Sequence, residues 1–190
     1  MSYCEDNDDV HYNYYPPIVA VFNVTDTSSP TQLLSSPQNI IEMEIDGVVQ
    51  PEVVNRYQFD TTGEHTVKYV LDDKTTISSG AFNSCQALIS VVIPDTVTSI
   101  GNSAFYYCRN LASVNIPDSV TSIGSSAFYR CSNLETITCL ATTAPTIQST
   151  TFGYVKTDGT LYVPTGSNYS TWMGTGNYYL GLYNWTKVEQ

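Results

Sequence analysis

The chain has 190 residues, enough for one domain with a smaller module attached. Its hydrophobic content of 42% allows a packed core, whereas its charged content of 13% is about half the usual share for a soluble protein. The net charge is −11, and residues 1–73 account for all of it, because residues 74–190 hold equal numbers of acidic and basic side chains. Without a basic region, the chain is not expected to bind nucleic acid or to insert into a membrane.

Residues 1–16 form an acidic segment that we expect to be a poorly ordered tail. The run from Glu5 to Asp9 lacks the glycine and the distal glutamate of a calcium-binding loop, so no metal or cofactor is expected. The segment also lacks the basic and apolar stretches of a signal peptide, so none is recognised in the chain as given.

Residues 17–73 show the alternation of apolar and polar side chains that is typical of β-strands. Ile41, Met43 and Ile45 are expected on one face of a strand, and Asp46-Gly47 is a strong signal for a hairpin turn. The pattern predicts a small antiparallel module. It is either an immunoglobulin-like unit or a cap for the region that follows, although about 55 residues are few for a seven-strand sandwich.

An internal period of 23 residues follows, over residues 74–164. The recurring positions are Phe82, Phe105 and Phe128; Cys85, Cys108 and Cys131; Leu88, Leu111 and Leu134; Ile77, Ile100 and Ile123; and Val91, Val114 and Ile137. One such unit cannot bury its own apolar side, so stacked units are expected to share a core, in about 3.5 coils. Each unit should contain one strand beginning near its leucine and one tight turn around its phenylalanine.

The repeated unit, I-P-x-x-V-T-S-I-G-x-x-A-F-x-x-C-x-x-L, resembles the BspA-like leucine-rich repeats of bacterial surface proteins. Similar repeats occur in proteins of phages that infect gut bacteria. The resemblance implies a mainly β fold, a short leucine-rich-repeat solenoid, and a role in adhesion or interaction.

Surface adhesins with such repeats usually carry many copies behind a leader, whereas this array is short and shows no leader. We therefore expect a phage virion component, such as a decoration, fibre or tail protein, that docks on capsid or tail proteins through residues 17–73. The alternative is a secreted or cell-surface bacterial adhesin. The expected location is accordingly a virion, the cell surface or the extracellular space.

No catalytic motif is recognised in the sequence. His65 is expected on the buried face of a strand with Val67, and no serine or cysteine nucleophile is paired with it. The repeated cysteines are expected to form a ladder of small buried thiols, because in-register side chains point the same way and disfavour a disulfide. Binding is therefore expected, and a glycan hydrolase is the least implausible enzyme.

Three surfaces are candidates for binding a protein or glycan ligand. The first is a ridge beside the core phenylalanines, formed by Tyr106, Tyr107, Arg109, Tyr129 and Arg130. The second is the strand face, formed by Ser90, Val92, Ser113, Asn115, Thr136 and Thr138. The third is an exposed aromatic platform within residues 165–190, formed by Trp172, Tyr178, Tyr179 and Trp185. For this C-terminal segment we favour a cap that seals the last coil, and unpaired strand edges also make a homo-oligomer a candidate assembly.

Overall fold

The structure, a computed structural model, describes residues 16–72 and 75–190. The acidic run from Glu5 to Asp9 and the expected boundary near Asp73 lie outside these residues. The strands are β1 (Ile18–Val24), β2 (Thr31–Gln32), β3 (Ile40–Ile45), β4 (Val48–Val49), β5 (Arg56–Tyr57), β6 (Gly63–Leu71), β7 (Thr76–Ile77), β8 (Leu88–Val92), β9 (Ser99–Ile100), β10 (Ser113–Ile116), β11 (Ser122–Ile123), β12 (Thr136–Cys139), β13 (Thr160–Val163) and β14 (Thr186–Glu189), with one 3₁₀ helix, η1 (Leu180–Tyr183).

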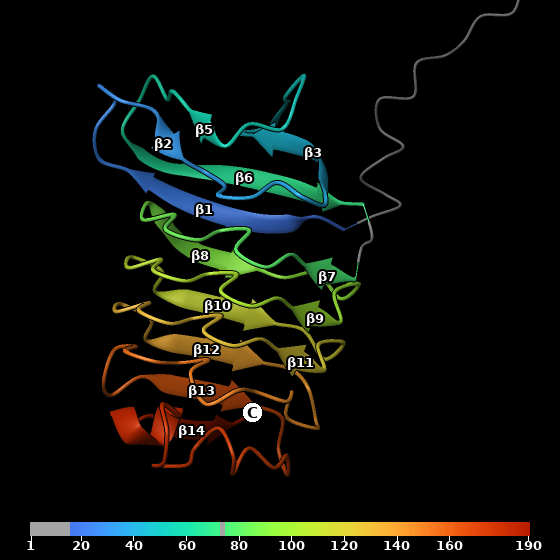
Figure 1. The fold of residues 1–190 in the computed structure, drawn as a ribbon, viewed down its shortest axis with the longest axis vertical. Helices are drawn as coiled ribbons and strands as arrows, with labels where there is room; N and C mark the ends of the chain where they lie inside the picture. Colours follow the sequence, from blue (N-terminus) through green and yellow to red (C-terminus); the bar gives the residue numbers. More distant parts are fainter. Residues whose placement is uncertain (1–15, 73–74) are drawn as a thin grey trace, which may run out of the picture.

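Stacked coils form the body of the molecule, which confirms the predicted solenoid (Figure 1). Strands β8, β10, β12, β13 and β14 lie parallel in one sheet, and β7, β9 and β11 form a second, shorter ladder beside it. Val114 lies opposite both Val91 and Ile137, so the strand register equals the sequence period. Because equivalent residues lie above one another, each coil contributes the same side chains to the core.

The N-terminal strands continue the same sheet. β1 pairs antiparallel with β6 on one side and with β8, the first strand of the repeats, on the other. The nine-stranded order is β14-β13-β12-β10-β8-β1-β6-β3-β4, and one apolar core runs through all of it. Residues 18–71 therefore cover the first coil and share its core.

One expectation for this region is wrong, namely that Ile41 shares a buried face with Met43 and Ile45. The pairing of β3 with β6 shifts between Ile40 and Glu42, so Ile41 is the extra residue of a β-bulge. Ile40 is buried in its place, and Ile41 is 56% exposed. The hairpin turn itself is confirmed, since both of its residues have positive φ, 50° at Asp46 and 84° at Gly47.

A ladder of stacked phenylalanines runs along the centre of the solenoid. Adjacent ring centroids from Phe82 through Phe105 and Phe128 to Phe152 are 5.1, 5.2 and 5.8 Å apart, with interplanar angles of 3°, 4° and 11°. At the N-terminal end Tyr69 meets Phe82 edge-on, at 5.2 Å and 75°. A differently oriented aromatic ring thus closes the ladder where the repeats begin.

The C-terminal segment closes the other end of the ladder and confirms the predicted aromatic cap. Trp172 is fully buried and lies 5.1 Å from Phe152 at an angle of 54°. Its indole nitrogen donates to the Pro145 carbonyl at 2.9 Å, and the buried Tyr169 hydroxyl donates to the Ala141 carbonyl at 2.7 Å. These bonds satisfy the polar atoms that burial of the cap removes from water.

Because the stacked phenylalanines form the centre of the core, replacement of a central ring should lower the stability of the protein. We predict that Phe105→Ala lowers the free energy of unfolding by about 3–5 kcal/mol, through lost burial and an unfilled cavity. Urea unfolding followed by fluorescence measures this loss. The control is Leu140→Ala, at a position that is 52% exposed, which should change stability by no more than about 0.5 kcal/mol. Equal losses in the two variants would contradict the ladder's role.

Candidate functional site

Each core phenylalanine is followed by a tight turn, and these turns stack along one edge of the solenoid. The amide of Cys108 donates to the carbonyl of Phe105 at 3.3 Å, and the same bond recurs in the neighbouring coils at 3.1 and 3.2 Å. We call residues 83–87, 106–110, 129–133 and 153–157 the turn edge. The predicted ridge lies on this edge.

One position of each turn has a left-handed backbone. Its φ values are 61° at Ser84, 64° at Tyr107, 61° at Arg130 and 58° at Tyr154. A left-handed residue other than glycine costs roughly 1–2 kcal/mol, and glycine or asparagine is the usual occupant. The presence of Tyr and Arg at this strained position therefore favours a role for their side chains in contacts at the turn edge.

The structure brings the five ridge residues together. Tyr106 and Tyr129 stack at 5.5 Å and 2°, and the guanidinium of Arg109 lies 4.2 Å from the centre of the Tyr107 ring. The guanidinium of Arg130 lies 5.7 Å from the same ring. Since Tyr106 and Tyr129 use ring faces to stack, they leave mainly their edges and hydroxyl groups for other contacts.

Two further tyrosines extend the ridge. Tyr154 is 48% exposed, lies 5.2 Å from Tyr129 and is 5.5 Å from the Arg130 guanidinium. Tyr178 packs on Tyr154 at 5.5 Å. Sequence reasoning did not place either of them on the ridge, because Tyr154 was not named and Tyr178 was assigned to the aromatic platform. Tyr154 could have been found from its spacing after Phe152, which matches that of Tyr107 after Phe105, whereas no pattern places Tyr178 at this edge.

A cavity of about 230 Å³ lies on the ridge and carries two positive charges. It is lined by Arg109, Arg130, Ser132 and Tyr154, and we call it the arginine pocket. Neither arginine has an ion-pair partner among the described residues. Hydrogen bonds to the Tyr107 hydroxyl and, less strongly, to the Tyr129 hydroxyl raise the pKa of Arg130. Both arginines are charged at physiological pH, as arginines in proteins always are.

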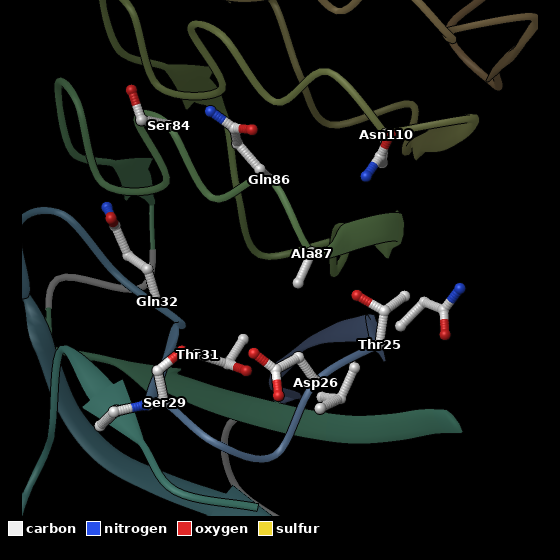
Figure 2. Close-up of a pocket in the computed structure, with 12 residues that line it drawn as sticks. Thr25, Asp26, Ser29, Thr31, Gln32, Ser84, Gln86, Ala87 and Asn110 are labelled. Atoms are coloured by element: carbon white, nitrogen blue, oxygen red, sulfur yellow. The ribbon is translucent and has the colours of Figure 1, made fainter. Parts of the chain in front are cut away.

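A second cavity, of about 430 Å³, lies between the loop of residues 25–32 and the first two turns (Figure 2). Polar side chains from both segments line it, and we call it the polar pocket. Gln32 ties the segments together by donating to the Asn83 carbonyl at 3.1 Å. Asp26 accepts the amide and hydroxyl of Ser28 at 2.8 and 2.7 Å, and these hydrogen bonds lower its pKa. No motif links the two segments, so sequence reasoning did not find this pocket.

The second predicted surface lies on the outward side of the parallel strands. Its six residues form two columns across the coils, one with Ser90, Ser113 and Thr136 and the other with Val92, Asn115 and Thr138. Val92 is 46% exposed and breaks an otherwise polar surface. This face presents smaller side chains than the ridge and no positive charge.

The exposed aromatic platform predicted for the C-terminal segment does not form. Trp172 and Trp185 are 0% and 5% exposed, and the Trp185 indole donates to the Lys156 carbonyl at 2.7 Å. Tyr178 and Tyr179 are half-buried. The tryptophans donate to backbone carbonyls of the last coil and cover that coil, which is why they are not available to a ligand.

Among the described residues, the buried histidine is held by one acidic side chain and one backbone carbonyl. His65 is buried as predicted, and its two ring nitrogens contact the Asp46 carboxylate at 2.7 Å and the Thr61 carbonyl at 3.0 Å. In the described part of the chain, no group of three or more acidic, His or Cys residues could hold a metal ion. No helix found there is long and apolar enough to cross a membrane.

The cysteine ladder consists of free, buried thiols. Cys108 donates to the Phe82 carbonyl at 2.9 Å, and Cys131 makes the same bond to Phe105 at 3.1 Å. Burial raises the pKa of Cys108 to about 12 and that of Cys85 well above its usual value. Thiols that stay protonated and covered are poor nucleophiles and poor metal ligands.

This burial predicts two results for a Cys4→Ser variant. The native protein should not react with a thiol reagent at pH 8, whereas the urea-unfolded protein should react at all four remaining cysteines. The free energy of unfolding should also fall as the pH rises from 9 toward 12. Unfolded thiols ionise at their ordinary pKa of about 9 while the buried thiols keep their protons, so alkaline pH favours the unfolded chain. Rapid labelling of the native protein would contradict the burial.

The left-handed backbone gives a prediction that separates stability from binding. We predict that Arg130→Gly leaves the Tm unchanged or raises it, because relief of about 1–2 kcal/mol of backbone strain offsets the lost contacts with tyrosine. Differential scanning fluorimetry measures the shift. Leu134→Gly, in the core of the same coil, provides the comparison and should unfold far more easily. A Tm loss for Arg130→Gly as large as that of Leu134→Gly would mean that Arg130 is needed for folding.

Comparison with known proteins identifies a repeat family. A family model described as the BspA type leucine rich repeat region matches residues 53–170 in six copies. This range covers more than half of the chain and contains the whole turn edge. Neither the curated proteins nor the solved structures include a significant match.

Proposed function

We propose that this chain, which belongs to the BspA-type leucine-rich-repeat family, is a binding protein. It recognises a protein or a glycan through the turn edge. Such repeats are typical of surface and extracellular proteins and form binding or structural folds rather than catalytic ones. The observation that carries the proposal is the ridge, where tyrosine and arginine occupy left-handed positions that glycine would fill at lower cost.

The turn edge is a better candidate than the strand face. Tyr and Arg are enriched among residues that dominate binding energy, whereas Ser, Thr and Val are under-represented there. Two cavities lie on the turn edge, and its aromatic groups are held in place by mutual stacking. A pre-organised surface loses little conformational entropy when it binds a ligand.

The setting that we propose is a phage virion, with residues 17–73 docked on a capsid or tail protein. The position of β4 supports this idea, because it ends the sheet and exposes Val48 and Val49 by 63% and 53%. A partner at this free strand would leave the ridge open to a ligand. The family's usual surface location favours the alternative, a secreted or cell-surface adhesin.

Binding can be tested with the tagged full chain on arrays of glycans and of host surface proteins. We predict that the triple change Tyr106→Ala, Tyr129→Ala and Arg130→Ala weakens the strongest interaction at least about 100-fold, since each lost anchor contributes about 1 kcal/mol or more. The matched control is Ser90→Ala, Ser113→Ala and Thr136→Ala on the strand face, which should bind normally. Loss of binding only in the control would place the site on the strand face.

The setting can be tested by immunogold labelling of a producing culture, with cells and particles imaged together. Label on virus-like particles is the expected result. Label on the cell envelope would favour the adhesin, and the turn-edge proposal would stand in either case.

A further inference from the structure

The two cavities of the turn edge are lined by consecutive residues of one turn. Asn110 lines the polar pocket, and Arg109, which precedes it, lines the arginine pocket. A ligand that fills both would have to extend across this turn. The cavities differ in charge, and this difference determines which ligand fits.

The arginine pocket is suited to an anionic group. The Arg109 and Arg130 guanidinium carbons lie 4.2 and 5.7 Å from the centre of the Tyr107 ring, so they are at most 9.9 Å apart. No carboxylate neutralises either of them in the described chain, although the net charge of the protein is −11. Stacking on tyrosine orients the guanidinium groups, and a bound anion would relieve their repulsion and accept their remaining N–H groups.

The polar pocket is suited to a neutral, hydroxyl-rich group. Gln86, Asn110, Ser84 and Thr31 line it (Figure 2), and side-chain amides and hydroxyls can both donate and accept hydrogen bonds. Asp26 is its only charged lining residue and would repel an anion while accepting hydroxyl protons. The edge therefore has a negative end and a positive end, which gives a bound ligand a fixed direction.

We propose that the turn edge binds an acidic oligosaccharide, with a neutral sugar in the polar pocket and the acid group at Arg109 and Arg130. This inference rests on the proposed function and names its ligand class. A glycan fits better than an acidic peptide for two reasons. Strands β8, β10 and β12 are paired on both sides, so no free strand edge is available here to an extended peptide, and the polar pocket has few apolar groups to anchor a side chain.

The test is titration calorimetry on the full chain with small acidic saccharides and with uncharged references. The probes are 3′-sialyllactose for a carboxylate, 3′-sulfolactose for a sulfate, and tri-galacturonate for an acid without a neutral end. Lactose and the methyl ester of sialyllactose are the uncharged references. We expect at least one acidic probe to bind 10-fold or more tightly than its uncharged reference, because hydrogen bonds to charged groups contribute about 1.5–3 kcal/mol.

Single substitutions test which residues contact each part of the saccharide. Arg109→Gln and Arg130→Gln should each weaken binding of the acidic probe about 10-fold or more and leave lactose binding unchanged. Arg56→Gln, the same change at an exposed arginine outside both pockets, should have no effect. Gln86→Ala should weaken lactose and the acidic probe by the same factor.

Several results would overturn the inference. Equal affinity for charged and uncharged probes, an unchanged affinity in both arginine variants, or no binding of any acidic probe at millimolar concentration would exclude an acidic glycan. Arginine-dependent binding of a hexaglutamate peptide, without binding of any saccharide, would exclude the glycan class. In each of these cases the proposed function would survive if the triple ridge variant still lost an array ligand, and it would fail if that variant bound normally.

Discussion

The parallel stacking of one phenylalanine per coil is the constraint on which the rest of the structure depends. Rings about 5 Å apart and within 11° of parallel require every coil to repeat at the same rise, and this rise matches the spacing of hydrogen-bonded strands. The register of the sheet, the cysteine ladder and the alignment of the turns follow from it. Tyr69 and Trp172 end the stack with rings at 75° and 54°, so neither end presents a flat aromatic face to another copy.

The same constraint keeps the inward-facing residues alike in every coil, whereas the residues at the turn edge are free to differ. Positions that face inward, such as Phe105 and Cys108, are nearly identical from coil to coil, whereas the next residues outward change from Asn83 to Tyr106 and Tyr129. The backbone of the turn determines where these side chains lie, but it does not determine which amino acids occupy the positions. A surface built in this way can acquire a binding site by substitution, at little risk to the core.

How much of the structure could be predicted from the sequence depends on how far apart in the chain the interacting residues lie. The coils and the alignment of Tyr106 with Tyr129 could be predicted because a fixed period determines them, and the cap could be predicted because the last coil of a stack must be sealed. The β-bulge at Ile41 could not, since it depends on pairing with a strand about 30 residues away. The polar pocket could not either, because its two walls come from a loop and from turns that share no motif. The burial of Trp172 depends on a backbone acceptor at Pro145, in the last coil, which the indole reaches only when the cap folds onto that coil.

The central claim is that ligands meet the turn edge and not the strand face, and hydrogen–deuterium exchange of the full chain tests it most directly. Exchange would be compared with and without whichever array ligand binds most tightly. The account predicts slower exchange in residues 83–87, 106–110 and 129–133, with β10 and β12 unchanged. Slower exchange confined to β10 and β12, with the turn edge unchanged, would contradict it.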